Sequence, residues 1–131
     1  MSVELTMLAY SVALLLALIV VQAVSAIQTQ GGKTLAGNRD NLKPPSAFEG
    51  RTRRTLYNHI EAMAMFAPLV LIAAVSGKSN SMTVLGAQLF FYARVLYSAS
   101  YLIGVPYLRS LIWMVGVAGI VIIFLALFGL A

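Results

Sequence analysis

The chain has 131 residues, of which 60% are hydrophobic and 10% are charged, and its formal net charge is +5. A soluble domain carries about a quarter charged residues, so this composition and the mean hydropathy of +0.89 indicate an integral membrane protein. The positive charge does not indicate nucleic-acid binding, because the basic residues gather in one connection and at helix ends. The chain has no cysteine, which excludes disulfides, thiolate metal sites and a protein thiol nucleophile.

Four apolar stretches follow one another, each long enough to cross a hydrocarbon core of about 30 Å as a helix. The predicted spans cover residues 5–27, 53–75, 82–103 and 107–130. No basic residue precedes the first stretch and no convincing cleavage site follows it, so we expect a span and not a signal peptide. The expected fold class is all-α, with residues 1–131 forming one integral membrane four-helix bundle.

Small residues recur in the first span, where Ala9, Ala13 and Ala17 are spaced by four residues. Such a row predicts a surface on which another helix packs closely.

The connection at residues 28–50 is polar and rich in glycine and proline, which predicts an irregular loop outside the bilayer. The loop could cover a functional site or simply connect two spans. The first connection and the start of the second span hold six of the nine basic residues, whereas the second connection holds only Lys78 and the termini hold none. The positive-inside rule therefore predicts that both termini lie on the non-cytoplasmic side. We expect the protein in a bacterial inner membrane.

Two polar stripes interrupt the apolar sequence. In the second span Arg54, Asn58 and Glu61 are spaced as i, i+4 and i+7, which places them on one face of a helix. In the third span, Arg94, Tyr97 and Tyr101 form a second stripe by the same reasoning. The predicted topology puts both stripes, with Arg109, on the cytoplasmic side at similar depth.

Glu61 and Arg94 lie roughly 12–15 Å inside the expected membrane, at 1.5 Å per residue from the helix ends. A lone charge at such a depth is unfavourable and needs a partner. We therefore predict a Glu61–Arg94 ion pair, within a subunit or across an interface. The pair could serve only to fix helix register, or it could belong to a functional site.

The other members of the stripes offer more hydrogen-bonding capacity than packing needs. The guanidinium group of arginine can donate two parallel hydrogen bonds to a carboxylate, and an acid such as Glu61 can bind an ammonium group. This set predicts a site for a small zwitterion with several carboxylates. His59 lies off the stripe, and we interpret it as a hydrogen-bonded interfacial histidine and not as a general base. Snorkelling at the interface accounts better for Arg51 and Arg53.

The pattern Arg54-x-x-x-Asn58-x-x-Glu61 resembles the signature of the MAPEG superfamily, the membrane-associated proteins in eicosanoid and glutathione metabolism. The stretch from Ala93 to Tyr101, followed by Leu108-Arg109-Ser110, also fits. Within this superfamily, the chain resembles a microsomal glutathione transferase-like member. The resemblance covers nearly the whole chain, and the two motifs together, in the right spans, are specific.

The resemblance implies a homotrimer of four-helix subunits that binds glutathione between neighbouring subunits, near the cytoplasmic side. The implied glutathione contacts are Arg54, Asn58, Glu61, Tyr97, Tyr101 and Arg109, with Arg94 as the partner of Glu61. Arg109 or Ser110 would stabilise the thiolate, because a cation or donor beside the sulfur favours its charged form.

The implied activity is that of a glutathione-dependent transferase or peroxidase. It would act on a lipophilic electrophile that arrives from the membrane lipid. A non-catalytic membrane protein of the same fold, with a structural or small-molecule-binding role, is the alternative. No metal and no nucleic-acid partner are expected.

Overall fold

The computed structural model describes all residues, 1–131, and the chain is all-α. Four long helices lie where the four spans were predicted, and a fifth, short helix lies in the first connection. The helices are α1 (Val3–Gln30), α2 (Gly32–Ala36), α3 (Ala47–Ser76), α4 (Ser81–Ile103) and α5 (Leu108–Leu127).

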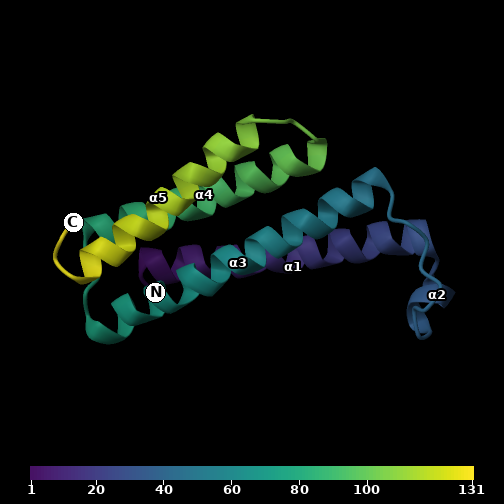
Figure 1. Ribbon diagram of the computed structural model, residues 1–131. Coiled ribbons are helices and arrows are strands. Elements are labelled where there is room, and N and C mark those ends of the chain that lie inside the picture. The colour runs from purple at the N-terminus through teal and green to yellow at the C-terminus, as the bar shows by residue number, and fades with distance from the viewer.

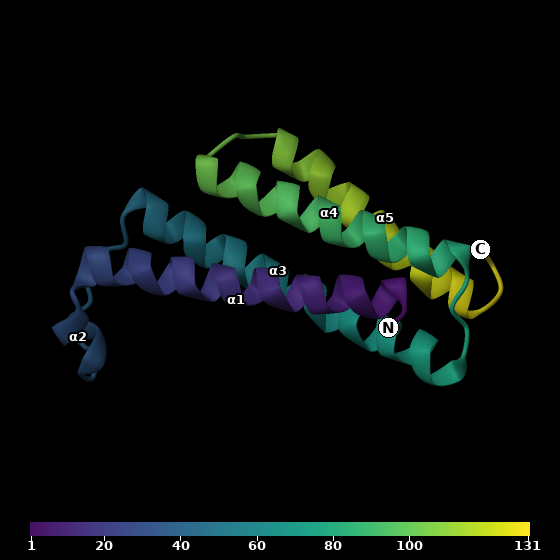
Figure 2. The ribbon, with the colours of Figure 1, turned by 180° about the vertical axis from the view of Figure 1, so that it is seen from behind.

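The long helices form two antiparallel pairs, α1 with α3 and α4 with α5 (Figures 1 and 2). The α4–α5 pair lies against the first half of α1 and along much of α3, and the α2 segment projects beyond the pair, next to the end of α1 and the start of α3. The start of α3, the end of α4 and the start of α5 face the same end of the molecule. The predicted convergence of the two polar stripes is therefore confirmed.

Three helices, α1, α3 and α5, are long and apolar enough to cross a membrane. With 23 residues, α4 is also long enough to cross a hydrocarbon core. Its composition is less apolar, because Gln88, Arg94 and several tyrosines and serines interrupt it. The polar residues that lower its hydropathy include those expected to form the site.

The closest helix crossing joins α4 and α5 through two buried glycines. A Cβ atom added to Gly86 would lie 2.6 Å from the Gly119 carbonyl oxygen, and one added to Gly119 would lie 2.5 Å from the Gly86 carbonyl oxygen. Only glycine allows two backbones to approach so closely. Next to this crossing, Phe66 of α3 stacks on Phe90 of α4, with 3.9 Å between ring centroids, in the centre of the core.

The alanine row of the first span does not pack inside the chain. Ala9, Ala13 and Ala17 are exposed, and α1 instead turns Met7, Ser11 and Leu18 inward. The prediction of close packing on the alanine row is therefore wrong for contacts within the subunit. The rotation of α1 about its axis follows from its polar contacts with α3, which the spacing of small residues does not report.

The first connection is more ordered than its composition predicts. It contains α2, and α3 begins at Ala47, within the stretch predicted to be loop. The Ser46 side chain caps α3 by accepting a hydrogen bond of 3.0 Å from the Glu49 amide. Serine followed three residues later by glutamate is a known helix-start signal, so the earlier start was readable from the sequence.

Candidate functional site

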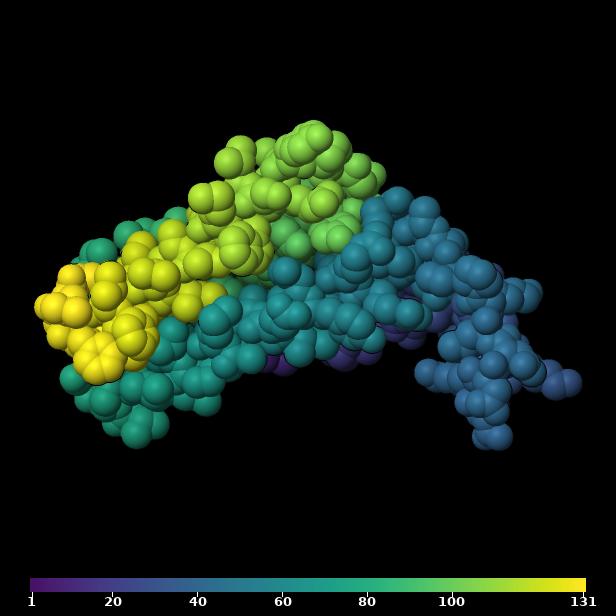
Figure 3. All heavy atoms as spheres, in the orientation of Figure 1, coloured from purple at the N-terminus to yellow at the C-terminus, as the bar shows by residue number.

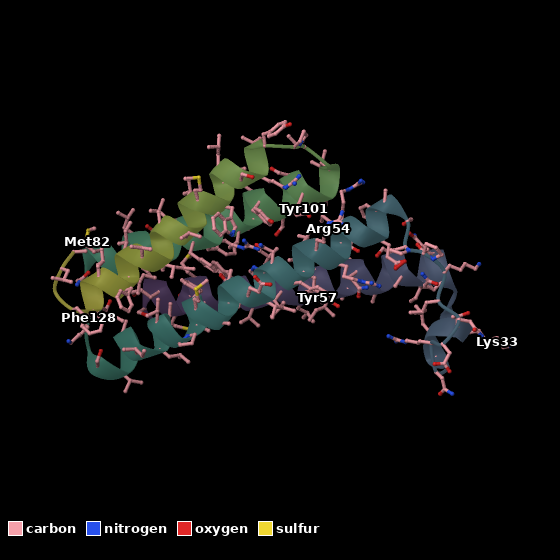
Figure 4. All side chains as sticks on the ribbon, viewed as in Figure 1. Lys33, Arg54, Tyr57, Met82, Tyr101 and Phe128 are labelled. Carbon is pink, nitrogen blue, oxygen red and sulfur yellow. The ribbon has the colours of Figure 1, made fainter.

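The candidate site lies where α3, α4 and α5 meet, at the end of the molecule that carries the α4–α5 connection. Arg54 of α3 donates a hydrogen bond of 2.8 Å from its Nε atom to the Tyr101 hydroxyl of α4. Figure 4 shows these two side chains reaching toward each other. The Arg109 guanidinium of α5 lies over the ring of the same tyrosine, 4.7 Å from its centroid. Tyr101 therefore brings together arginines from two other helices.

The array continues into the protein through a second tyrosine. The rings of Tyr97 and Tyr101 meet edge to face, with 5.8 Å between centroids. The Arg94 guanidinium lies 4.5 Å from the centre of the Tyr97 ring, which favours the cation through the electron-rich ring face. Two adjacent tyrosine rings thus form a row, with the Arg94 guanidinium at one end and the Arg109 guanidinium at the other.

Arg94 is the buried end of this row, with 2% of its surface exposed. Its Nη1 atom donates a hydrogen bond of 2.7 Å to the Asn58 side-chain oxygen, and its Nε atom donates one of 3.2 Å to His59 Nδ1. Its Nη2 atom has no hydrogen-bond partner. Both acceptors are neutral, so the guanidinium charge has no counter-ion within the chain.

The predicted Glu61–Arg94 ion pair does not form within the subunit. The salt bridge in the chain joins Arg53 and Glu49, and Glu61 is exposed. The side chains of Asn58 and His59, from the preceding turn of the same helix, take the places near the guanidinium. An ion pair across a subunit interface stays a prediction.

His59 is the residue that sequence reasoning placed outside the site. It is fully buried, and besides accepting from Arg94 it bonds through Nε2 to the Ser11 carbonyl oxygen of α1, at 3.0 Å. Since the Arg94 N–H occupies Nδ1, the proton sits on Nε2 and the ring is neutral. The prediction that this histidine is hydrogen-bonded and not a general base fits this geometry, but it lies in the core and not at an interface. The available sequence signal was a polar residue next to Asn58 in an otherwise apolar span, since a polar group buried there needs a hydrogen-bond partner.

A small cavity opens between Arg94 and Glu61. Its volume is about 90 Å³, and Asn58, Glu61 and Arg94 line it together with Trp113 and apolar residues of α3, α4 and α5. The predicted contact residues other than Ser110 therefore border this cavity or the row of tyrosines beside it. Ser110 is exposed in the first turn of α5, next to Arg109.

The charges of the site favour an anionic ligand. Three arginines, Arg54, Arg94 and Arg109, stand against one carboxylate, that of Glu61. Arg54 and Arg109 retain terminal N–H groups that no protein acceptor occupies. Guanidinium groups bind carboxylates through two parallel hydrogen bonds, and the Glu61 carboxylate can receive a cationic group of the same ligand.

The fold and these residues define a class: an all-helical membrane protein whose polar site is set among apolar helices. The model of the MAPEG family matches residues 7–129, and the chain belongs to this family. The matched residues include α2 to α5, α1 from Met7 onward, and all the candidate site residues. No curated protein and no solved structure matches the chain.

Proposed function

We propose that the protein is a glutathione-dependent membrane transferase or peroxidase. The observation that carries the proposal is the Arg94 guanidinium, which is buried, lacks a counter-ion in the chain and keeps its Nη2 atom without a hydrogen-bond partner. An uncompensated buried charge is strongly destabilising. A bound carboxylate would satisfy it, and glutathione provides two carboxylates with an ammonium group.

The residues around Arg94 suit the rest of this co-substrate. Arg54 holds the other carboxylate, Glu61 receives the ammonium group, and Asn58, Tyr97 and Tyr101 supply neutral hydrogen bonds. Arg109, with Ser110 beside it, faces the thiol. Its positive charge stabilises the thiolate and lowers the thiol pKa. The thiolate sulfur then forms a bond to the electrophile, whose leaving group departs with its electron pair.

A trimer would complete the site. The cavity of about 90 Å³ between Glu61 and Arg94 is well below the roughly 300 Å³ at which small-molecule sites begin. Large apolar side chains on the outer faces of α3 and α5 are exposed, among them Met65, Trp113 and Val121. We propose that four spans per subunit pack as a homotrimer around glutathione, with lipophilic substrate reaching the site from the membrane.

The proposal is tested by thiolate absorbance in detergent solution. Added glutathione should give the thiolate band near neutral pH with the wild-type protein. Arg109→Ala should reduce the band at least about tenfold, since a shift of one pKa unit corresponds to a factor of ten. Arg109→Lys keeps the charge and should retain part of the band, and Lys33→Ala, a cation far from the cluster, should leave it unchanged.

The outcomes separate the two candidate functions. A folded wild-type protein that neither binds glutathione nor forms the thiolate would favour the alternative, a non-catalytic membrane protein of the same fold. That alternative has its own support, because Asn58 and His59 already satisfy two N–H groups of Arg94. Binding with a thiolate band that Arg109→Ala leaves intact would overturn only the role given to Arg109.

A further inference from the structure

A second, larger cavity lies away from the arginine–tyrosine cluster, where α2 and the segment after it fold back over the end of α1 and the start of α3. Its volume is about 550 Å³, within the range of about 300–1,000 Å³ that is usual for small-molecule sites. None of its lining residues belongs to the proposed glutathione site. Figure 3 shows the segment that forms it projecting from the body of the molecule.

The cavity wall is held in place by buried side chains. Gln30, at the end of α1, accepts a hydrogen bond of 2.7 Å from the Lys43 amide and donates one of 2.8 Å to the Lys43 carbonyl oxygen. Glu49 is fully buried and receives a further bond of 3.4 Å from Gln30. The backbone of Lys43 thus fixes the loop to the end of α1, and Gln30 links that end to α3 through Glu49, so the cavity is a built feature of the fold.

The charges around this cavity are positive. Arg53 is neutralised by Glu49, whose carboxylate lies 3.5 Å from its guanidinium. Arg39 uses Nε to donate a hydrogen bond of 2.9 Å to the Leu35 carbonyl oxygen, which leaves its terminal nitrogens free. Lys43 makes no side-chain contact with any acid of the chain. Two cations on a fixed loop therefore face the cavity without counter-ions, and such a pair fits a phosphate group.

The opposite wall is apolar and belongs to a helix able to cross a membrane. It is lined by Ala23, Ala26 and Ile27 of α1, together with Leu35 of α2 and Leu42 of the loop. The 28 residues of α1 span about 42 Å, more than the roughly 30 Å of a hydrocarbon core. The last turns of α1 therefore reach headgroup level, where a cavity can accept a charged head and an apolar chain together.

We propose that this cavity binds an anionic phospholipid of the membrane. Arg39 and Lys43 hold the phosphate, and one acyl chain lies along Ala23 and Ala26 of α1. Basic pockets on the cytoplasmic side of membrane helices have this chemistry, and the predicted topology places the first connection on that side.

The test is native mass spectrometry of the detergent-solubilised protein with phosphatidylglycerol, using phosphatidylcholine as the neutral lipid. Phosphatidylglycerol should bind more tightly. Arg39→Gln and Lys43→Gln should each weaken it about fivefold, the usual effect of one basic residue at a membrane surface. Lys33→Gln removes a nearby exposed cation that does not line the cavity and should have little effect. Ala23→Leu, which fills the apolar wall, should weaken lipid binding and not the binding of inorganic phosphate.

Three results would overturn the proposal. The first is equal weakening by Lys33→Gln, which would reveal general charge attraction. The second is inorganic phosphate that binds as tightly as the lipid, which would identify a site for free phosphate. The third is a disulfide crosslink between subunits of the Arg39→Cys variant when no lipid is bound. Such a crosslink would show that a neighbouring subunit, and not a lipid, covers the cavity.

Discussion

At the residue scale, the feature that organises the site is the pair of neutral acceptors around Arg94. Asn58 and His59 are adjacent in α3, yet they reach different nitrogens of the same guanidinium. His59 passes the contact on to the Ser11 carbonyl of α1. One imidazole thereby joins three helices and fixes the orientation in which Arg94 meets the cavity.

Replacing His59 tests this arrangement. His59→Phe should lower the thermal stability in detergent, because it leaves the Arg94 Nε–H buried without a partner, at a cost of about 1–3 kcal/mol, and removes the side-chain contact between α3 and the Ser11 carbonyl of α1. His59→Asn retains a short acceptor for Arg94 and should lose less. The melting temperature followed by circular dichroism measures both effects. An unchanged melting temperature for His59→Phe would contradict the structural role given to the histidine.

At the scale of the elements, the α4–α5 hairpin depends on the glycine crossing. The two helices present Arg94, Tyr97, Tyr101 and Arg109 from opposite sides of their shared interface. Any separation of the helices would therefore move the Arg109 charge away from Tyr101. The crossing at Gly86 and Gly119 sets this geometry although both residues lie far from the site.

The glycines of α4 and α5 offer a matched comparison. Gly86→Ala should destabilise the protein and disturb the site, because the new Cβ would meet both the Gly119 carbonyl and the Ile123 side chain at 2.6 Å. Overpacking of this kind costs about 1–3 kcal/mol. Gly116→Ala lies on the same interface, but its Cβ would meet Ala93 at an ordinary 3.6 Å. Melting temperatures should fall for the first variant only, and similar values for the two would refute the crossing as the controlling contact.

At the scale of the whole molecule, the exposed Glu61 and the buried, uncompensated Arg94 are the strongest indication that one chain is incomplete. The two residues border the same small cavity without pairing. In the proposed trimer Glu61 meets a cation of the ligand or of the neighbouring subunit. The exposed alanine row of α1 is available to the same assembly.

Glu61→Gln distinguishes assembly from ligand binding. We expect the variant to weaken both the trimer and glutathione binding, because it removes the only carboxylate of the site. Analytical ultracentrifugation in detergent measures the assembly, and glutathione titration measures the affinity. A monomeric wild-type protein would contradict the trimer, whereas a weaker trimer with unchanged glutathione affinity would assign Glu61 to assembly alone.

The sequence by itself determined the class of fold and the end of the molecule at which the site lies. Apolar length dictates helices, the 3.6-residue period puts Arg54 with Asn58 on one face and Arg94 with Tyr97 on another, and the distribution of basic residues aligns those faces. The tertiary structure alone decided the partners of Arg94, the burial of His59 and the exposure of the alanine row. The rotation of each helix about its axis is fixed by contacts between residues far apart in the chain, such as His59 with Ser11 and Gly86 with Gly119. Those contacts leave no local periodicity from which they could be read.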